Sequence, residues 1–372
     1  MKDVLQFHNV QLEILSPVHI GDGYTISKKE YLYDKLGNRI KVFDIPKLFN
    51  IFTKKGSSAD NEITRYLLEN RNADTLAQLL RKYSINSKEC IKYELEASVS
   101  NEYDLKKREI YSFVKDAYGL PYVPGSTIKG LLKSAIISYK IYNDDYLQRT
   151  IKNEIIEVAD SFEKKNKKYL ANGVNGTIEG VFDRIIDKNK GRKEGNIVRG
   201  FSGLVVSDSR PITDRSPLIL AQKVDYSLER NEGCLPIYKE SLKPGIKVDF
   251  SLTIDTQILN ISVDYIKEAL NFYQKVAYQH FYKQYGRGED SSDIIWIGGG
   301  AGFTSKTIIY QLFGSDAPEI CNKIFSKTLG DKIYYRHKHD EYKDSLTPHT
   351  CKCTIYQNEL YDMGKARIRF LD

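Results

Sequence analysis

The sequence predicts an α+β fold of two domains, each an antiparallel sheet backed by helices. The chain has 372 residues, which is more than a single domain usually holds. Strands with alternating apolar residues are predicted in both halves, at 10–14 and at 248–254. Amphipathic helices are also predicted in both halves, at 128–139 and at 263–285. This recurrence indicates two related units.

The composition is that of a folded chain with a basic surface. Apolar residues make up 41% and charged residues 28%, which excludes a disordered protein. Lys and Arg total 56 against 49 Asp and Glu, a formal net charge of +7, and this favours a polyanionic partner. The same Lys-rich composition is also what an A/T-rich genome encodes. Charge alone therefore favours a nucleic acid only slightly.

No segment predicts membrane insertion or export. The N-terminus lacks the apolar region of a signal peptide, and no stretch approaches about 18 uninterrupted apolar residues. Five cysteines, an odd and sparse set, argue against a disulfide framework and for a reducing compartment. We therefore expect a cytoplasmic protein that does not contact a membrane.

The first half begins with strands and an inserted helical layer. Alternating apolar residues at 10–14 indicate a half-buried strand, and a turn rich in Pro and Gly follows at 16–23. The other elements predicted before residue 120 are strands at 30–33, 40–43 and 109–114 and a helical insertion at about 46–100.

The middle of the chain combines two predicted helices with a basic loop. The amphipathic helix at 128–139 is followed by a second helix at 146–165. The segment at about 164–199 contains ten Lys or Arg against four Asp or Glu, with five glycines interspersed. We interpret it either as a solvated loop or as a basic flap that folds onto a nucleic acid.

The second half contains the predicted domain boundary. Lys243-Pro244-Gly245 is typical of a turn, so we predict domains at 1–243 and 244–372. The remaining predicted strands lie at 204–206, 219–226, 235–238 and 365–370.

The strongest binding motif is Pro124-Gly125-Ser126-Thr127-Ile128-Lys129-Gly130, at the start of the clearest helix. Ser126 is a natural N-cap, and Gly125 lets the backbone approach a ligand closely. Lys129 and Lys133 lie on one polar face in the first turns, where cations oppose the helix dipole. A bound phosphate would reverse this penalty, because free N–H groups and lysines both attract it. In the alternative interpretation, both lysines are solvated and cover the helix.

A second motif of this kind follows the apolar segment 294–297. Gly298, Gly299 and Gly300 precede Gly302, and such a run costs conformational entropy unless the backbone packs tightly or contacts a ligand. Gly302 to Lys306 has the spacing Gly-x-Thr-x-Lys that is also found from Gly125 to Lys129, and it leads into a helix predicted at 308–313. A nucleotide-binding P-loop is excluded, because Ser305 occupies the position of its second glycine.

Two further patterns point to chemistry. His19, in the first Gly- and Pro-containing turn, has the residue type of a general base, although a histidine between Val18 and Ile20 is more often structural. His337, His339, His349, Cys351 and Cys353 resemble a zinc-binding set in composition. Their His-x-His and Cys-x-Cys spacing differs from the usual Cys-x-x-Cys, and a polar loop before the last strands is the alternative. We therefore predict no metal and no cofactor.

The motifs, in this order, resemble the RAMP superfamily of CRISPR-associated proteins. Within it, the chain is most similar to the family of fifth subunits of the type III-A Csm effector complex. The resemblance spans residues 10 to about 370. The segments that carry it are 16–23, 124–130, 298–300 and Tyr361-Asp362-Met363-Gly364-Lys365.

This resemblance implies two ferredoxin-like (RRM-type) domains and a non-catalytic role in antiviral defence. The implied partners are the CRISPR guide RNA (crRNA) and other Csm subunits, chiefly the repeated backbone subunit. The implied role is to cap the backbone stack at the 3′ side of the guide. The subunit is also needed for maturation of the guide 3′ end, with trimming either here or by host nucleases.

The resemblance also carries over individual residues. The implied contacts with the guide backbone are Gly125, Ser126, Thr127, Lys129, Lys133, Gly298, Gly299, Gly300 and Lys306. His19 matches the first loop of the family without an assigned role, and nothing is carried onto 164–199. The alternative is a metal-independent endoribonuclease that cleaves precursor RNA through His19. Since no second candidate base is evident, we favour binding.

Overall fold

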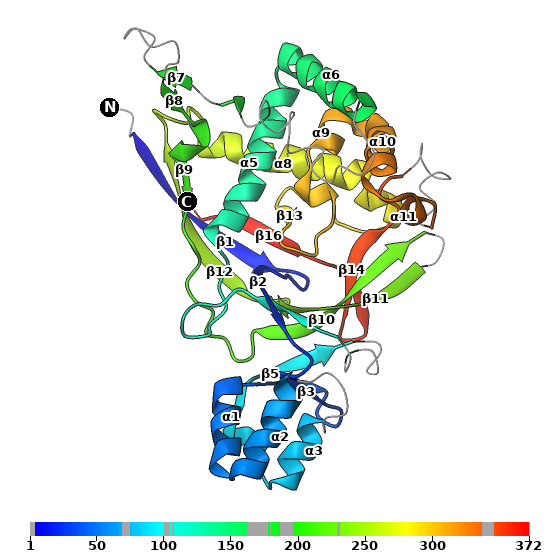
Figure 1. The fold of residues 1–372 in the computed structure, drawn as a ribbon. Coiled ribbons are helices and arrows are strands. Elements are labelled where there is room, and N and C mark those ends of the chain that lie inside the picture. The colour runs from blue at the N-terminus through cyan, green and yellow to red at the C-terminus, as the bar shows by residue number, and fades with distance from the viewer. Residues whose placement is uncertain are drawn as a thin grey trace.

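The computed structural model forms two β-sheets, a layer of helices over one of them and a separate helical insertion (Figure 1). The structure describes residues 4–68, 75–99, 105, 108–161, 178, 180–182, 184–186, 196–228, 231–336 and 346–371. Strands and helices both contribute to the core, which confirms the predicted α+β class.

The smaller sheet has five antiparallel strands in the order β13-β16-β1-β12-β9. Their bounds are β1 (Leu5–Ile14), β9 (Leu204–Val206), β12 (Lys247–Asp255), β13 (Ile294–Trp296) and β16 (Lys365–Phe370). The predicted alternation is confirmed, because Val10, Leu12 and Ile14 are buried whereas Gln11 and Glu13 are partly exposed. The apolar face therefore points into the core.

The larger sheet has nine strands. Its main order is β2-β6-β11-β10-β5-β4-β3, and β14 joins β10 and β15. The bounds are β2 (Gly21–Ile26), β3 (Tyr31–Asp34), β4 (Arg39–Phe43), β5 (Ile91–Ser98), β6 (Ile110–Phe113), β10 (Leu218–Ser227), β11 (Asn231–Leu242), β14 (Cys351–Tyr356) and β15 (Glu359–Asp362). β10 pairs in parallel with β5, and β11 pairs in parallel with β6. The expectation of purely antiparallel sheets is therefore wrong for this sheet.

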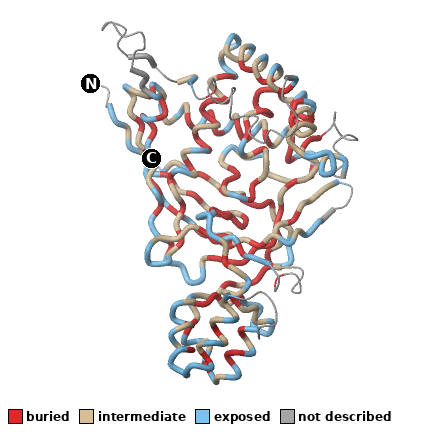
Figure 2. Tube along the Cα trace, viewed as in Figure 1, coloured by how far each residue is buried: buried red, intermediate tan, exposed pale blue. Residues whose placement is uncertain are grey.

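A layer of helices covers the five-stranded sheet, as Figure 1 shows. The helices are α5 (Gly125–Tyr142), α6 (Asp145–Ser161), α8 (Val263–His280), α9 (Ile309–Phe313), α10 (Ala317–Thr328) and α11 (Asp331–Arg336). The central pair, α5 and α8, pack against each other, and buried residues of both helices lie in the main core (Figure 2). Both helices were expected from their apolar periodicity, and α8 ends at His280 before the 3₁₀ turn η4 (Tyr282–Tyr285).

The predicted helical insertion is confirmed. It contains α1 (Ile45–Lys54), α2 (Ser57–Leu68), α3 (Leu76–Lys82) and the 3₁₀ turn η1 (Ser87–Glu89). Asp44 caps α1 by accepting from the Lys47 N–H at 3.0 Å, and Pro46 lies in the first turn, where it lacks only an N–H that needs no partner. The insertion has its own apolar core and joins the nine-stranded sheet through β4 and β5.

The two sheets do not follow the predicted domain boundary. The turn at 243–245 does separate β11 from β12, and Gly245 has a φ of +90° there. However, β1 lies between β12 and β16, while β14 joins β10. The expectation that each half builds its own sheet is therefore wrong, because long-range pairing interleaves the two halves.

The basic segment at about 164–199 lies largely outside the described residues. Within it, β7 (Arg184–Ile186) and β8 (Asn196–Val198) pair as an antiparallel ribbon. The 3₁₀ turn η3 (Gly200–Gly203) then leads into β9. Both interpretations of the segment, as a loop or as a flap, stay predictions.

Candidate functional site

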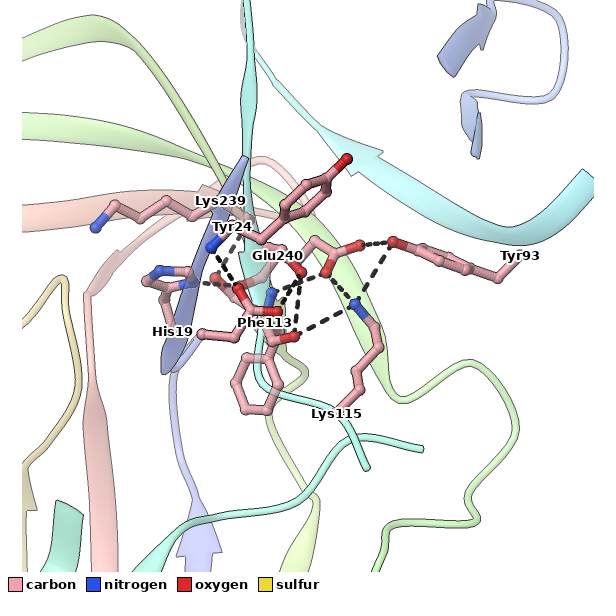
Figure 3. A network of polar contacts seen from close by, with 10 residues as sticks. His19, Tyr24, Tyr93, Phe113, Lys115, Lys239 and Glu240 are labelled. Atoms are coloured by element: carbon pink, nitrogen blue, oxygen red, sulfur yellow. Dashed lines mark hydrogen bonds and ion pairs between the residues drawn. The ribbon is translucent and has the colours of Figure 1, made fainter. Parts of the chain in front are cut away.

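Glu240 is the centre of a buried polar network in the nine-stranded sheet (Figure 3). Its carboxylate accepts from the Tyr93 hydroxyl at 2.6 Å and from the Phe113 N–H at 2.8 Å. The Lys115 ammonium forms an ion pair with the same carboxylate and lies 4.8 Å from the centroid of the Tyr93 ring. Burial and the Glu240 anion raise the pKa of Tyr93, so its hydroxyl stays a donor. These partners compensate the burial of a charged group.

His19 lies in the turn between β1 and β2 and is held by the same network. Its Nδ1 donates to the Glu240 backbone carbonyl at 2.7 Å, which leaves Nε2 as the acceptor of a neutral imidazole. The residue is only 4% exposed. Burial, helped by the charges of Lys239 and Lys306, lowers the pKa of His19 to about 4. The imidazole is therefore uncharged at neutral pH.

The glycine run 298–300 packs against His19 and Met363 too closely for side chains. The Gly299 N–H donates to the His19 carbonyl at 2.7 Å. A Cβ on Gly298 would lie 2.2 Å from the His19 carbonyl oxygen, and one on Gly300 would lie 2.2 Å from the Met363 sulfur. Internal packing therefore explains these glycines, which the sequence assigned either to tight packing or to a ligand.

Four lysines next to this run form what we call the lysine cluster: Lys223, Lys239, Lys306 and Lys352. Lys239 Nζ donates to the Gly299 carbonyl at 3.0 Å, and the Lys352 side chain packs against Gly302. Burial, then repulsion from Lys223 and Lys306, lowers the pKa of Lys239 to about 8. Burial, then repulsion from Lys352, lowers the pKa of Lys223.

The lysine cluster carries more positive charge than its surroundings neutralise. Asp225 lies 3.7 Å from Lys223 Nζ and 3.0 Å from Lys352 Nζ. Lys306 is exposed, and its ammonium has no hydrogen bond or ion pair with the described part of the chain. An excess of cations beside exposed loop backbone suits a ligand that carries phosphates.

One exposed aromatic ring lies beside Lys239 on the sheet, and a second lies on the neighbouring strand. Tyr111 on β6 is directly paired with Lys239, and the lysine Nζ lies 5.7 Å from the centroid of the Tyr111 ring. Tyr24 lies on the neighbouring strand β2, where Thr25 pairs with Tyr111. The two tyrosines are 46% and 54% exposed, so their faces are available for stacking. Aromatic faces next to cations are typical of surfaces that bind single-stranded nucleic acid.

The start of α5 differs from the prediction. Pro124 occupies the N-cap position and Gly125 is the first helical residue, so the assignment of Ser126 as the N-cap is wrong. The Gly125 N–H donates to Asp208 Oδ1 at 2.7 Å, and a Cβ on Gly125 would lie 2.3 Å from the Val206 carbonyl oxygen. Gly125 therefore approaches its own chain, and Asp208 supplies the anion that the helix dipole favours.

Lys129 and Lys133 lie half-buried on α5. Burial, then repulsion from Lys133, lowers the pKa of Lys129. The Lys133 ammonium lies 5.5 Å from the centroid of the Phe201 ring, within cation–π range. These contacts agree with lysines that cover the helix, and their contact with RNA stays a prediction.

The second Gly-x-Thr-x-Lys segment has a different local structure. Lys306 ends the 3₁₀ turn η5 (Thr304–Lys306), and α9 begins at Ile309. The helix predicted at 308–313 is therefore confirmed, but Lys306 precedes it and does not lie in its first turn. The fold brings His19, the glycine run and Lys306 together. Lys129 and Lys133 lie on a different element, α5, and this helix packs against η5.

The residues that connect this site were not predicted from the sequence. Lys239 and Glu240 follow the predicted strand 235–238, and β11 continues through them to Leu242. Tyr238 and Glu240 lie on the same, buried face of β11. A charged residue at a position where the strand's alternation predicts burial could have drawn attention to Glu240. Lys223 and Lys352 carried no comparable signal, because an isolated lysine in a strand is usually solvated.

Within the described part of the chain, the structure separates the residues whose composition resembles a zinc-binding set. His337 and His339 lie outside the described residues. Cys351 and Cys353 lie close together, but the third residue near them is Asp362, with all three ligand atoms within 4.8 Å of one another. His349 does not belong to this group.

No helix in the described part of the chain is both long and apolar enough to span a membrane.

The RAMP superfamily model matches residues 11–301. Streptococcus thermophilus CRISPR system Cms protein Csm5 is 25% identical over 334 residues, covering 84% of this chain and 83% of the relative. The Mycobacterium tuberculosis protein of the same name is 23% identical over 401 residues, covering 99% of this chain and 98% of the relative.

Solved structures share the fold. One chain of a cryo-EM Csm–crRNA–target RNA ternary complex from a type III-A CRISPR-Cas system aligns with a TM-score of 0.65 at 20% identity, covering 98% of this chain and 100% of that chain. The crystal structure of T. onnurineus Csm5 aligns with a TM-score of 0.58 at 17% identity, covering 96% and 99%.

Proposed function

This chain belongs to the RAMP superfamily, and from that membership we propose that it is a non-catalytic, RNA-binding subunit of a type III-A CRISPR (Csm) effector complex. The full-length similarity to Csm5 proteins supports a Csm subunit. The observation that carries RNA binding is the lysine cluster, where one carboxylate, Asp225, pairs with Lys223 and Lys352, and where Lys239 lies beside the exposed ring of Tyr111. Such a surface attracts phosphates and stacks bases.

We also propose a position for this subunit within the complex. The subunit caps the backbone stack at the 3′ side of the crRNA, contacts the repeated backbone subunit and is needed for maturation of the guide 3′ end, with host nucleases as candidate trimming partners. A cap must offer one interface and withhold the matching one, because a repeated head-to-tail interface would extend a filament. We expect a monomer in isolation and one copy per complex, and native mass spectrometry that finds an open-ended homopolymer would contradict this.

We place phosphate contacts at the glycine run and Lys306, and we add Lys239, whose Nζ lies 3.0 Å from the Gly299 carbonyl oxygen. Gly125, Ser126, Thr127, Lys129 and Lys133 form a secondary contact, since Asp208 already occupies the start of α5. Phosphate contacts carry little sequence information, so binding should tolerate any guide sequence.

The test is co-purification of the tagged protein from its native cell, followed by sequencing of the bound RNA. We expect CRISPR guides and Csm-type subunits in the eluate. The variant Lys239→Ala plus Lys306→Ala should retain the protein partners and lose guide RNA in reconstitution with purified components. Recovery of neither RNA nor Csm-type partners by the wild-type protein would contradict the proposal.

A metal-independent endoribonuclease is the competing function, and one observation favours it. The His19 Nε2 is a fixed acceptor near the charges of Lys239 and Lys306. Against it, the ring is buried, and a pKa of about 4 makes a weak general base at neutral pH. Loss of a true general base lowers the rate by about 10²-fold or more. We therefore expect His19→Ala to leave RNA processing unchanged, and cleavage by pure protein that depends on His19 would favour the endoribonuclease.

A further inference from the structure

The hairpin of β14 and β15 brings three possible metal ligands together. Cys351 and Cys353 alternate on β14, so their side chains point to the same face, and Cys353 lies directly opposite Asp362 on β15. Both sulfurs and a carboxylate oxygen lie within 4.8 Å of one another. From this geometry we propose that Cys351, Cys353 and Asp362 bind one zinc ion.

The distances require little movement. Zinc binds cysteine sulfur at about 2.3 Å and carboxylate oxygen at about 2.0–2.2 Å, so two sulfurs of a tetrahedral site lie about 3.8 Å apart. The ligand atoms are at most 4.8 Å apart, and a contraction of about 1 Å or less completes the site. Rotation about the side-chain bonds suffices, since the strand pairing already places all three residues.

The surroundings of Asp362 leave one of its carboxylate oxygens available to a cation. Its side chain is 5% exposed, and its Oδ2 accepts from the Gly288 N–H at 3.0 Å. Its Oδ1 lies 3.7 Å from Arg287 Nε, beyond hydrogen-bond distance, and accepts no hydrogen bond within the described structure. A buried carboxylate oxygen in this state loses solvation without full compensation.

Charge balance selects a divalent, thiophilic ion. Two thiolates and one carboxylate carry three negative charges, and a dication with the Arg287 guanidinium carries three positive charges. Arg287 is fixed there, because Nη1 donates to the Leu360 carbonyl at 2.9 Å and the guanidinium lies 5.1 Å from the centroid of the Tyr226 ring. Binding releases one proton from each thiol, and a water molecule completes the fourth position. Thiolates favour zinc over magnesium or calcium.

The hairpin connects this site to the candidate RNA surface. Lys352 lies between the two cysteines and packs against Gly302, while Met363 follows Asp362 and packs against Gly300. The ion would therefore hold the hairpin that positions one lysine of the lysine cluster. This consequence rests on the proposed function, whereas zinc binding itself does not.

The experiment measures zinc in the full-length protein by plasma mass spectrometry after extensive desalting. We expect about one zinc ion per wild-type chain and almost none in Cys351→Ala plus Cys353→Ala. The matched controls are Cys234→Ala, at an exposed position of β11, and Cys321→Ala, at a buried position of α10, and both should retain the ion. Asp362→Asn should weaken zinc binding in competition with a chelator.

Cobalt(II) provides a second measurement, whose main result comes from the wild-type protein and does not depend on the stability of a variant. The wild-type protein loaded with cobalt should show the sulfur-to-cobalt charge-transfer absorption of two thiolates, and each single Cys→Ser variant should halve it. Absence of both zinc and this absorption in the folded wild-type protein would overturn the proposal. Zinc retained undiminished by the double variant would also overturn it. If the wild-type protein retains zinc but does not bind guide RNA, the proposed function fails and the zinc site stands.

Discussion

The two Gly-x-Thr-x-Lys segments share a spacing and differ in structure. Gly125 starts an 18-residue helix whose first N–H is bound by Asp208. Gly302 has a φ of +89°, and Lys306 ends a short 3₁₀ turn before α9. In the first segment the chain supplies its own anion. In the second segment, the Lys306 ammonium has no anionic partner among the described residues, and its positive charge lies close enough to Lys239 to lower the pKa of that lysine.

This difference shows that spacing alone does not define a phosphate site. In a segment with this spacing, the N–H groups and the lysine either bind an anion from elsewhere in the chain or keep positive charge for a ligand. The outcome depends on which distant side chain reaches the segment. The second segment is therefore the stronger candidate for RNA binding. The four predictions below test this contrast, and the first two concern the buried network that supports the glycine run.

The largest expected effect is on stability, at Glu240. Glu240→Ala should lower the free energy of unfolding by about 3–5 kcal/mol, because Lys115 loses the partner of a buried ion pair. Urea unfolding followed by circular dichroism measures this. The matched control is Glu62→Ala, which removes the exposed partner of Lys82 at 2.7 Å and should have little effect. Equal effects would show that the network does not support the glycine run.

The second prediction concerns pH. The pKa of His19 in the folded state is about 4, below its ordinary value of 6.5, so the unfolded chain binds more protons between these values. The stability from neutral His19 is fully present above about pH 6.5 and is lost as the pH falls to about 4, by up to about 3 kcal/mol. Urea unfolding at several pH values should show a shallower dependence for His19→Gln than for wild type. Parallel curves would contradict the neutral, buried state of His19.

The third prediction compares two glycines of α5. Gly125→Ala should destabilise the protein by about 1–3 kcal/mol, because its Cβ would lie 2.3 Å from the Val206 carbonyl oxygen. At Gly130 no described atom beyond its chain neighbours and the backbone of its own helix lies within 4 Å of a Cβ, and Gly130→Ala should stabilise the helix by up to about 1 kcal/mol. Thermal unfolding measures both. A neutral Gly125→Ala would mean that the chain does not need this close approach, and a role in ligand contact would regain support.

The smallest effects are those on RNA affinity, measured as the salt dependence of binding to single-stranded RNA. Lys239→Ala plus Lys306→Ala should reduce the slope of log K against log salt by about 1.4, since each phosphate contact contributes about 0.7. Lys129→Ala plus Lys133→Ala should reduce it by about one unit or less, because one of these lysines already lies over an aromatic ring. Lys54→Ala plus Lys55→Ala, at the exposed end of α1, is the control and should not change the slope. Equal losses from all three pairs would indicate nonspecific basicity.

Lys239 offers a further control for the same measurement. Its pKa of about 8 means that it loses charge at moderately alkaline pH, whereas arginine does not. RNA affinity of the wild-type protein should fall from pH 7 to pH 9 more steeply than that of Lys239→Arg. Identical pH profiles would exclude Lys239 from the contact.

The candidate site was predictable only in parts. His19 and the glycine run both stood out in the sequence, because Gly and Pro mark turns through their own backbone preferences. Their contact was not predictable, since the hydrogen bond from the Gly299 N–H to the His19 carbonyl joins opposite ends of the chain. The assignment of Ser126 as the N-cap failed for the same reason. The Gly125 N–H is bound by Asp208, which lies 83 residues away in the chain.

The sequence by itself determined the elements whose signals are local. Apolar periodicity defined β1 and α5, because neighbouring residues decide these preferences. Only the tertiary structure decided that β1 lies between β12 and β16 and that Glu240 is buried beside Lys115. Each of these pairs segments far apart in the chain, and the free energy of such pairing comes from burial and charge compensation in the assembled fold, which no short window of sequence contains.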